Sequence, residues 1–269
     1  MTKRRHALQD LTWVEFAERL KTDRPVILLP LGSQEEQGPH APMGDYVVAE
    51  HIALAAAERA DAICAPVLPF GYAEFFRGMA GGIQLRADTF SRVLEDMLTA
   101  FLDHDIVHIV ICNGHSTNAP LIADVTHKIR RQWGVVVPNL NLWRLMPDAV
   151  WQDIHGANAA KARGHGADPL TSVAMHLTPD LMRPDLLGTA DRKTAFGLPI
   201  TGQFSNLLFQ GSQIDVPLDV TQVAPDGVGG GDARLSTAAA GAAMTEWLTA
   251  YVAEFLTHFK SCDPKTPNG

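Results

Sequence analysis

The sequence predicts an α/β fold, a three-layer sandwich in which a mainly parallel β-sheet is flanked by helices on both faces. Three observations support this prediction. Apolar runs of strand length alternate with stretches of helical spacing, the connections are short, and the strand-like runs are apolar throughout. A strand that is apolar on both faces is typical of a parallel sheet covered by helices. At 269 residues, we expect one domain that spans residues 1–269.

The expected elements follow one another as strand and helix in turn. The expected strands are PVILLPLG (25–32), AICAPVLPFG (62–71), IVHIVICNG (106–114) and GVVVPNLNLW (134–143). The expected helices cover residues 12–22, 45–60, 89–105, 119–133 and 236–259, with Thr12 and Thr89 as N-caps of the first and third. Residues 190–232 are rich in Gly, Pro and Asp, which predicts long loops there.

Composition and charge exclude several classes of protein. The net charge is -8, and no cluster of Lys and Arg is present that could bind phosphates, so we expect no nucleic-acid partner. No apolar run reaches the roughly 18 to 20 residues that span a bilayer, and the N-terminus lacks the apolar run of a secretory signal. We therefore expect a cytoplasmic protein without membrane contact. Its three cysteines, Cys64, Cys112 and Cys262, are expected to be reduced, the first two in the core.

Polar side chains gather in loops that follow the strands. The loop after residues 25–32 carries Glu35, Glu36, Gln37, His40 and Asp45, the loop after 106–114 carries His115, and a third segment, GHGADPLTS (164–172), carries His165 and Asp168. In open parallel sheets, ligands bind outside the carboxyl ends of the strands, where such loops meet.

Carboxylates that share a buried point repel one another unless a cation compensates them. Asp, Glu and His are the usual ligands of a catalytic Zn²⁺ or Mn²⁺, so these loops indicate a metal site. A simpler interpretation stays open on the residues alone. In it, Glu35 and Glu36 are solvated, Asp45 caps the helix that follows it, and His115 makes a hydrogen bond inside a turn.

Four segments in order resemble the creatininase family, whose type member is creatinine amidohydrolase. LGSQEEQGPHAPMGD resembles its Gly-Ser-x-Glu-x-His-Gly-Pro-His-Leu-Pro signature with a closing Asp, and CNGHSTN resembles its Asn-Gly-His-Gly-Gly-Asn. GHGADPLTS is similar to His-Ala-Gly-Glu-x-Glu-Thr-Ser, and DGVGGGDARLSTAAAG to the Gly-Val-x-Gly-Asp-Pro segment and its Ala-rich helix. The resemblance covers residues 31 to 241 and implies a creatininase-like fold.

By position, the resemblance implies that Glu35, Asp45 and His115 form one metal site, with Asp45 placed to bridge toward a second. Asp168 stands where the family has a glutamate and would supply an acidic ligand to that second metal. The implied cofactor is one or two divalent ions per chain, zinc or manganese.

The chain departs from the family at other ligand positions. Gln37 replaces a family histidine and would be a weak ligand, and His40, the second loop histidine, could take its place. Leu170 replaces the second glutamate of the third motif.

The implied activity is hydrolysis of a carbon–nitrogen bond in a small or cyclic amide by attack of metal-bound water. His165 is the expected general acid/base, because an imidazole titrates near neutral pH. Arg77 could clamp a substrate carboxylate, and Phe76 and Trp143 could line the substrate pocket. Members of the family tend to assemble as hexamers, so the resemblance implies that this chain forms a homo-oligomer.

Three other functions remain open on the sequence. The chain could be a degenerate member with a binding or structural role, or could catalyse a related metal-dependent reaction such as lactone opening or deformylation. The GVGGGD run at Gly227–Asp232 could suggest a nucleotide-binding enzyme, but it does not follow an expected strand as a phosphate cradle requires.

Overall fold

Four parallel strands form the central sheet of the computed structural model, which describes residues 4–190, 193–201 and 206–268. The strands are β1 (Ile27–Leu31), β2 (Ile63–Cys64), β3 (Ile109–Asn113) and β4 (Asn139–Asn141), in the order β2-β1-β3-β4. Leu31 at the end of β1 is paired with Asn113 at the end of β3, so the loops that follow these two strands leave the sheet side by side. This confirms the parallel sheet predicted from the apolar runs.

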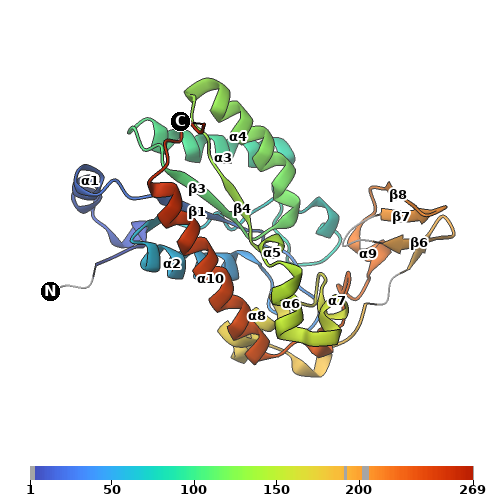
Figure 1. The fold of residues 1–269 in the computed structure, drawn as a ribbon. Helices are drawn as coiled ribbons and strands as arrows, with labels where there is room; N and C mark the ends of the chain where they lie inside the picture. The colour runs from blue at the N-terminus through green and yellow to red at the C-terminus, as the bar shows by residue number, and fades with distance from the viewer. Residues whose placement is uncertain (1–3, 191–192, 202–205, 269) are drawn as a thin grey trace.

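Helices cover both faces of this sheet (Figure 1). The longer ones are α1 (Trp13–Thr22), α2 (Tyr46–Ala60), α3 (Ala87–Leu102), α4 (Ala119–Trp133) and α10 (Ala238–Lys260), and the shorter ones are α5 (Leu142–Leu145), α6 (Asp148–His155), α7 (Ala159–Ala162), α8 (Leu170–Leu177) and α9 (Val220–Val223). Short 3₁₀ turns lie at Leu8–Asp10, Glu74–Phe76, Ser116–Asn118, Gly156–Asn158, Pro179–Leu181, Pro184–Leu186 and Ala233–Leu235.

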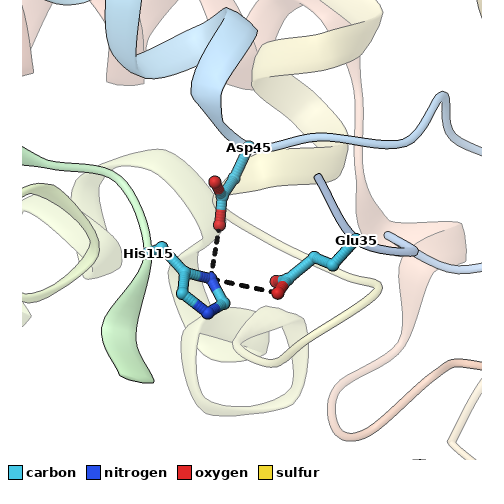
Figure 2. A group of neighbouring side chains, drawn as sticks. All are labelled: Glu35, Asp45 and His115. Atoms are coloured by element: carbon cyan, nitrogen blue, oxygen red, sulfur yellow. Dashed lines mark hydrogen bonds and ion pairs between the residues drawn. The ribbon is translucent and has the colours of Figure 1, made fainter. Parts of the chain in front are cut away.

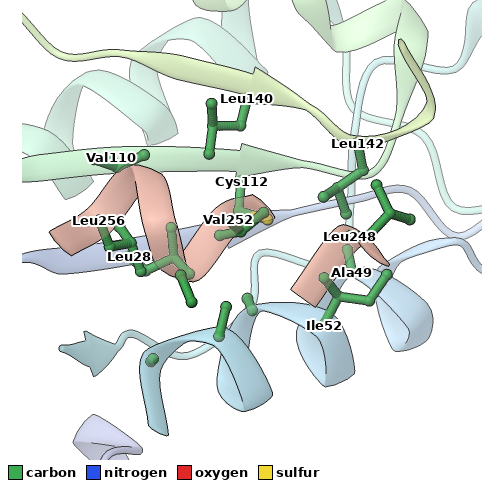
Figure 3. Packing of buried hydrophobic residues seen from close by; sticks show 14 of the residues in the cluster. Leu28, Ala49, Ile52, Val110, Cys112, Leu140, Leu142, Leu248, Val252 and Leu256 are labelled. Atoms are coloured by element: carbon green, nitrogen blue, oxygen red, sulfur yellow. The ribbon is translucent and has the colours of Figure 1, made fainter. Parts of the chain in front are cut away.

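Alternate residues of each strand face opposite layers, which gives two apolar cores. On one face, Leu28, Val110 and Cys112 pack with α2 and α10 (Figure 3). On the other face, Ile27 and Ile109, among others, pack with α3 and α4. Burial of each such side chain contributes roughly 1.5 to 3 kcal/mol, which explains why the strands are apolar on both sides. The three-layer α/β fold predicted from the sequence is confirmed.

The N-cap predicted from the sequence is correct for α1 and wrong for α3. Thr12 caps α1 through a capping box with Glu15, as expected. The third helix begins at Ala87 instead of after Thr89, and Arg86 occupies its N-cap position without a side-chain cap. The predicted Thr89 cap is therefore wrong.

Residues 194–201 and 206–215 contain the four strands of a small antiparallel sheet, where the sequence predicted loops. Its strands are β5 (Thr194–Ala195), β6 (Leu198–Thr201), β7 (Asn206–Phe209) and β8 (Ser212–Asp215), in sequence order. Two-residue turns join β5 to β6 and β7 to β8, and all four turn residues have positive φ: Phe196 (53°), Gly197 (74°), Gln210 (49°) and Gly211 (83°). Turns of this type match the twist of paired strands, and Gly at the second position adopts a positive φ without steric strain.

Two further expectations concern membranes and cysteines. Within the described residues, no helix combines the length and apolar character needed to cross a bilayer. Cys64 and Cys112 are free and buried in the core, as predicted, and Cys262 is free and partly buried.

Candidate metal centre and active site

A cluster of Glu35, Asp45 and His115 lies at the carboxyl edge of the sheet (Figure 2). Glu35 belongs to the loop after β1, Asp45 directly precedes α2, and His115 follows β3. Each residue offers one ligand atom, and these three atoms lie within 4.8 Å of one another. The parallel pairing of β1 and β3 thus brings together residues that are 70 positions apart.

One imidazole nitrogen faces both carboxylates of the cluster. Nδ1 of His115 lies 2.8 Å from Oδ2 of Asp45 and 3.1 Å from Oε2 of Glu35. On its other side, Nε2 of His115 lies 3.1 Å from the carbonyl oxygen of Tyr72. All three side chains of the cluster are about 2 to 3% exposed.

Burial and mutual charge shift the pKa values in this cluster. Burial raises the pKa of Asp45 to about 6, against the opposing effect of His115. Burial lowers the pKa of His115, but the carboxylates of Glu35 and Asp45 outweigh it and raise the value to about 10. Two acidic side chains therefore converge on one imidazole nitrogen in a buried place.

The donor set fits a divalent cation. A single Nδ1 proton cannot serve both carboxylates, and in the part of the chain that the structure describes, Oε2 of Glu35 makes no hydrogen bond. An ion in place of that proton would contact all three groups. Two carboxylates and one imidazole are the ligand types of catalytic zinc and manganese sites, which keep a position open for water.

The simpler interpretation of these loops does not match the geometry. Asp45 occupies the N-cap position of α2 but makes no side-chain cap. Its Oδ1 instead accepts a hydrogen bond from the backbone N–H of Ser33, at 2.6 Å, and its Oδ2 faces His115. Glu35 is buried and not solvated.

A small cavity of about 40 Å³ opens on the cluster, with room for a few water molecules. It is lined by Glu35, Gln37, Asp45, His115, Ser116, Trp143, Gly164, His165, Gly166, Pro169 and Leu170. Gln37 directs its Nε2 to Oε1 of Glu35 at 3.1 Å, so its amide supports a predicted ligand. Trp143 donates its indole N–H to the carbonyl oxygen of Gly114.

His165 reaches the same cavity and is paired with Glu36. Nε2 of His165 lies 2.8 Å from Oε1 of Glu36, and both side chains are about 10% exposed or less. Burial lowers the pKa of His165, but the Glu36 carboxylate outweighs this effect and raises the value. Glu36, which the sequence would allow to be solvated, is therefore buried in a pair that sequence reasoning missed.

Asp168, which the resemblance implies as a ligand of a second metal, lies outside the cluster of Glu35, Asp45 and His115. Its carboxylate accepts hydrogen bonds from the backbone N–H of Ser172 (2.9 Å), the hydroxyl of Ser172 (2.7 Å) and the hydroxyl of Ser236 (2.6 Å). Nε2 of His155 lies 2.8 Å from Oδ2 of Asp168, the oxygen that also accepts the Ser172 hydroxyl. These contacts hold the carboxylate between α8, α6 and the start of α10, so the implied second-metal role is not supported.

Two other predicted side chains lie outside the cavity. His40 is buried and faces the hydroxyl of Thr171 (3.0 Å) through Nε2, away from the place that the sequence suggested for it. Burial lowers the pKa of His40. Arg77 is about half exposed, and both oxygens of Glu74 occupy its guanidinium at 2.7 Å. The proposed substrate clamp at Arg77 is therefore not supported by the geometry.

Phe76 contacts the histidines of the site instead of lining the cavity. Its ring lies 4.5 Å from that of His165 and 6.2 Å from that of His115, between ring centroids. Phe76 is 1% exposed, so its role here is packing, and the expected direct contact with substrate is not supported.

The glycine run at 227–232 serves close packing. The backbones of Gly164 and Gly230 approach so closely that a Cβ on Gly164 would lie 2.1 Å from the carbonyl carbon of Gly230. The run does not follow a strand of the parallel sheet, so the context of a nucleotide-binding loop is missing.

The fold and the cluster together define a layered α/β protein with a candidate carboxylate–histidine metal site at the carboxyl edge of its sheet. The chain belongs to the creatininase family, because the family model described as creatinine amidohydrolase matches residues 9–256. The members of this family are metal-dependent amidohydrolases, and the resemblance noted in the sequence is confirmed.

Several curated proteins are similar over part of their length. The chain is 27% identical to a creatinine amidohydrolase of Pseudomonas putida over 65% of this chain and 73% of that protein. It is 25% identical to a 3-dehydro-scyllo-inosose hydrolase of Thermotoga maritima over 66% of this chain and 58% of that protein. It is 26% identical to a mycofactocin precursor peptide peptidase of Mycobacterium ulcerans over 65% and 67% of the two chains.

Solved structures confirm the creatininase fold. A crystal structure of creatinine amidohydrolase superposes with a TM-score of 0.81 at 21% identity and covers 97% of this chain and 100% of that one. A variant creatininase described as Zn-Zn type gives 0.79 at 22% identity, with 95% and 98% covered. A structure titled Creatininase Mn gives 0.78 at 22% identity, also with 95% and 98% covered.

Proposed function

We propose that this chain is a hydrolase that uses one divalent ion, zinc or manganese, to cleave a carbon–nitrogen bond in a small or cyclic amide. The observation that carries the proposal is the buried cluster of Glu35, Asp45 and His115 beside a small cavity. Family membership supports the same chemistry, because similar proteins are named for creatinine and for a precursor peptide.

A single ion fits the residues that the structure describes. In those ranges, three His, Asp or Glu side chains converge closely enough to share an ion, and Asp168 is engaged elsewhere. Gln37 adds a neutral amide, which is a poor ligand for zinc beside imidazole. A divalent ion in the cluster would lower the pKa of a coordinated water toward about 7 and polarise a substrate carbonyl.

The residues of the chain supply the remaining steps. His165 lines the same cavity as the cluster, so its imidazole is placed to deliver a proton to the departing nitrogen. Trp143 borders the cavity with its ring fixed by the hydrogen bond to Gly114, which supports the predicted role of a pocket wall. The small volume favours a compact substrate.

The proposal is tested with protein prepared without chelator and then loaded with Zn²⁺ or Mn²⁺. Creatinine, other small cyclic amides, short peptides, simple lactones and formylated amines are offered in parallel, and product formation is followed by mass spectrometry. We expect hydrolysis of at least one amide by the wild type, about one ion per chain, and loss of both ion and activity in Glu35→Ala.

The two alternative functions predict different outcomes of this experiment. Turnover of lactones or formyl groups but of no amide would replace the proposed reaction with a related one. A chain that binds no zinc or manganese, and hydrolyses nothing after they are added, would be a binding or structural member of the family.

A further inference from the structure

Glu36 is a buried carboxylate that the metal cluster does not use. Both of its oxygens are engaged: Oε1 faces Nε2 of His165 at 2.8 Å, and Oε2 accepts the backbone N–H of Gly38 at 2.7 Å. Its exposed fraction is 8%. The backbone hydrogen bond at Oε2 fixes the orientation of the carboxylate, so Oε1 points in one direction, toward His165.

The Glu36 carboxylate lies against the backbone of a glycine, Gly227, where a side chain would collide with it. Gly227 has φ of +79°, and a Cβ built on it would lie 2.4 Å from Oε2 of Glu36. The absence of a side chain at Gly227 therefore allows Glu36 to reach His165. This gives the first glycine of the 227–232 run a role at the site.

The ring of His165 is held from two directions. Nε2 faces Glu36, and the ring of Phe76 packs on it with a centroid distance of 4.5 Å and an interplanar angle of 37°. Phe76 is itself fixed in a buried apolar cluster with Ile200, Leu207 and Val220. A carboxylate that accepts a hydrogen bond from one imidazole N–H keeps the proton on that nitrogen, so the other nitrogen is the one that exchanges protons.

We propose that Glu36 is the positioning residue of His165: it holds the proton on Nε2 and fixes the ring, so that Nδ1 is the nitrogen that exchanges protons with the substrate. This inference rests on the proposed hydrolase function. Nδ1 gives a proton to the departing nitrogen, and the attacking water returns one to Nδ1. Glu36 itself contacts neither the substrate nor the ion.

The test compares Glu36→Gln and Gly227→Ala with Gly211→Ala. An amide offers one acceptor oxygen where the site presents two donors, from His165 and Gly38, so Glu36→Gln disrupts the pair. Gly227→Ala displaces the carboxylate by contact. Gly211→Ala is the matched control, because its φ of +83° carries similar backbone strain and no atom of the described residues lies within 4 Å of the added Cβ.

The primary measurement is the ¹H–¹⁵N spectrum of the histidine rings in the zinc-loaded protein, with the His165 signals assigned by their loss in His165→Asn. We expect a wild-type spectrum with Nε2 protonated and a single ring environment. We expect that Glu36→Gln and Gly227→Ala shift or broaden these signals, while Gly211→Ala leaves them unchanged. Zinc content stays at the wild-type value in all three.

Kinetics on the amide found in the functional screen provide the second measurement. We expect kcat to fall about 10²-fold in Glu36→Gln and Gly227→Ala with KM changed by less than about threefold, as for loss of an oriented acid/base. Unchanged His165 signals in both variants, or loss of zinc from Glu36→Gln, would overturn the proposal. If the wild type hydrolyses no amide, the proposed function fails, and the ring spectra still decide whether Glu36 positions His165.

Discussion

Replacement of Asp45 by Asn removes one negative charge from the metal cluster and nearly preserves its shape. The distances allow an estimate for the metal-free protein. At an effective dielectric constant of about 20, loss of the Asp45–His115 contact at 2.8 Å forfeits about 6 kcal/mol of attraction. Loss of the repulsion between Asp45 and Glu35, whose ligand oxygens lie within 4.8 Å, returns at least about 3 kcal/mol.

Desolvation of the Asp45 carboxylate costs the wild-type protein several kcal/mol, and the neutral Asn side chain avoids most of this cost. This difference offsets the rest of the lost attraction to His115. The Asn side-chain oxygen can still accept the hydrogen bond from Ser33. We therefore expect that the free energy of unfolding of metal-free Asp45→Asn lies within about 2 kcal/mol of the wild-type value. With a divalent ion bound, no such offset exists, and we expect affinity to fall at least about 100-fold, or about 2.7 kcal/mol.

The assay combines calorimetric titration of Zn²⁺ or Mn²⁺ into metal-free protein with urea unfolding in the presence and absence of the ion. Asp185→Asn is the matched control, because Asp185 is an exposed carboxylate paired with Arg183 and should change neither quantity appreciably. Wild-type metal affinity in Asp45→Asn would refute the ligand role. A loss of more than about 4 kcal/mol in the metal-free protein would refute the reasoning that relief of repulsion and of desolvation offsets the lost contact with His115.

Three further predictions concern residues around the cluster. His165→Asn should lower kcat by about 10² to 10⁴-fold and keep the ion, as measured by kinetics and metal analysis; loss of the ion would make His165 a ligand instead. Asp168→Asn should lower the free energy of unfolding in urea by about 3 kcal/mol, because it disturbs a carboxylate bound by Ser172 and Ser236, and should leave ion binding unchanged. Arg77→Ala should leave KM within about twofold of the wild-type value, since Arg77 is an exposed residue paired with Glu74. A tenfold rise in KM would support the role of Arg77 as a substrate clamp.

The layered fold could be predicted because its signal is local and repeated. Runs such as residues 27–31 and 109–113 are apolar at every position, and that pattern requires helices on both faces. The small sheet of strands β5 to β8 has no clear sequence signal, because its two described turns are Phe-Gly and Gln-Gly, without the Asn-Gly or Asp-Gly pairs that mark hairpins. The start of α3 was misplaced because Thr89 is a good cap by residue type, while Arg86 holds the position by backbone geometry alone.

The convergence of Glu35 and His115 could be predicted because both follow neighbouring parallel strands, and the choice of Glu35, Asp45 and His115 as a group came from the resemblance to the creatininase family. The direction of individual loop side chains could not be predicted. Glu35 and Glu36 are neighbours, but one faces His115 and the other faces His165, and loop spacing contains no signal for that choice. Asp168 lies in the predicted motif, but one of its partners, Ser236, is 68 residues away, and no local pattern indicates that pairing.

The central claim is that one divalent ion is bound by Glu35, Asp45 and His115. Its most direct test is a crystal structure of the zinc-loaded protein with anomalous diffraction recorded on both sides of the zinc absorption edge. We predict one strong anomalous peak per chain, within about 2.0 to 2.2 Å of an atom from each of the three side chains. A map without a peak there, or with its peak on Glu36 and His165 instead, would contradict it.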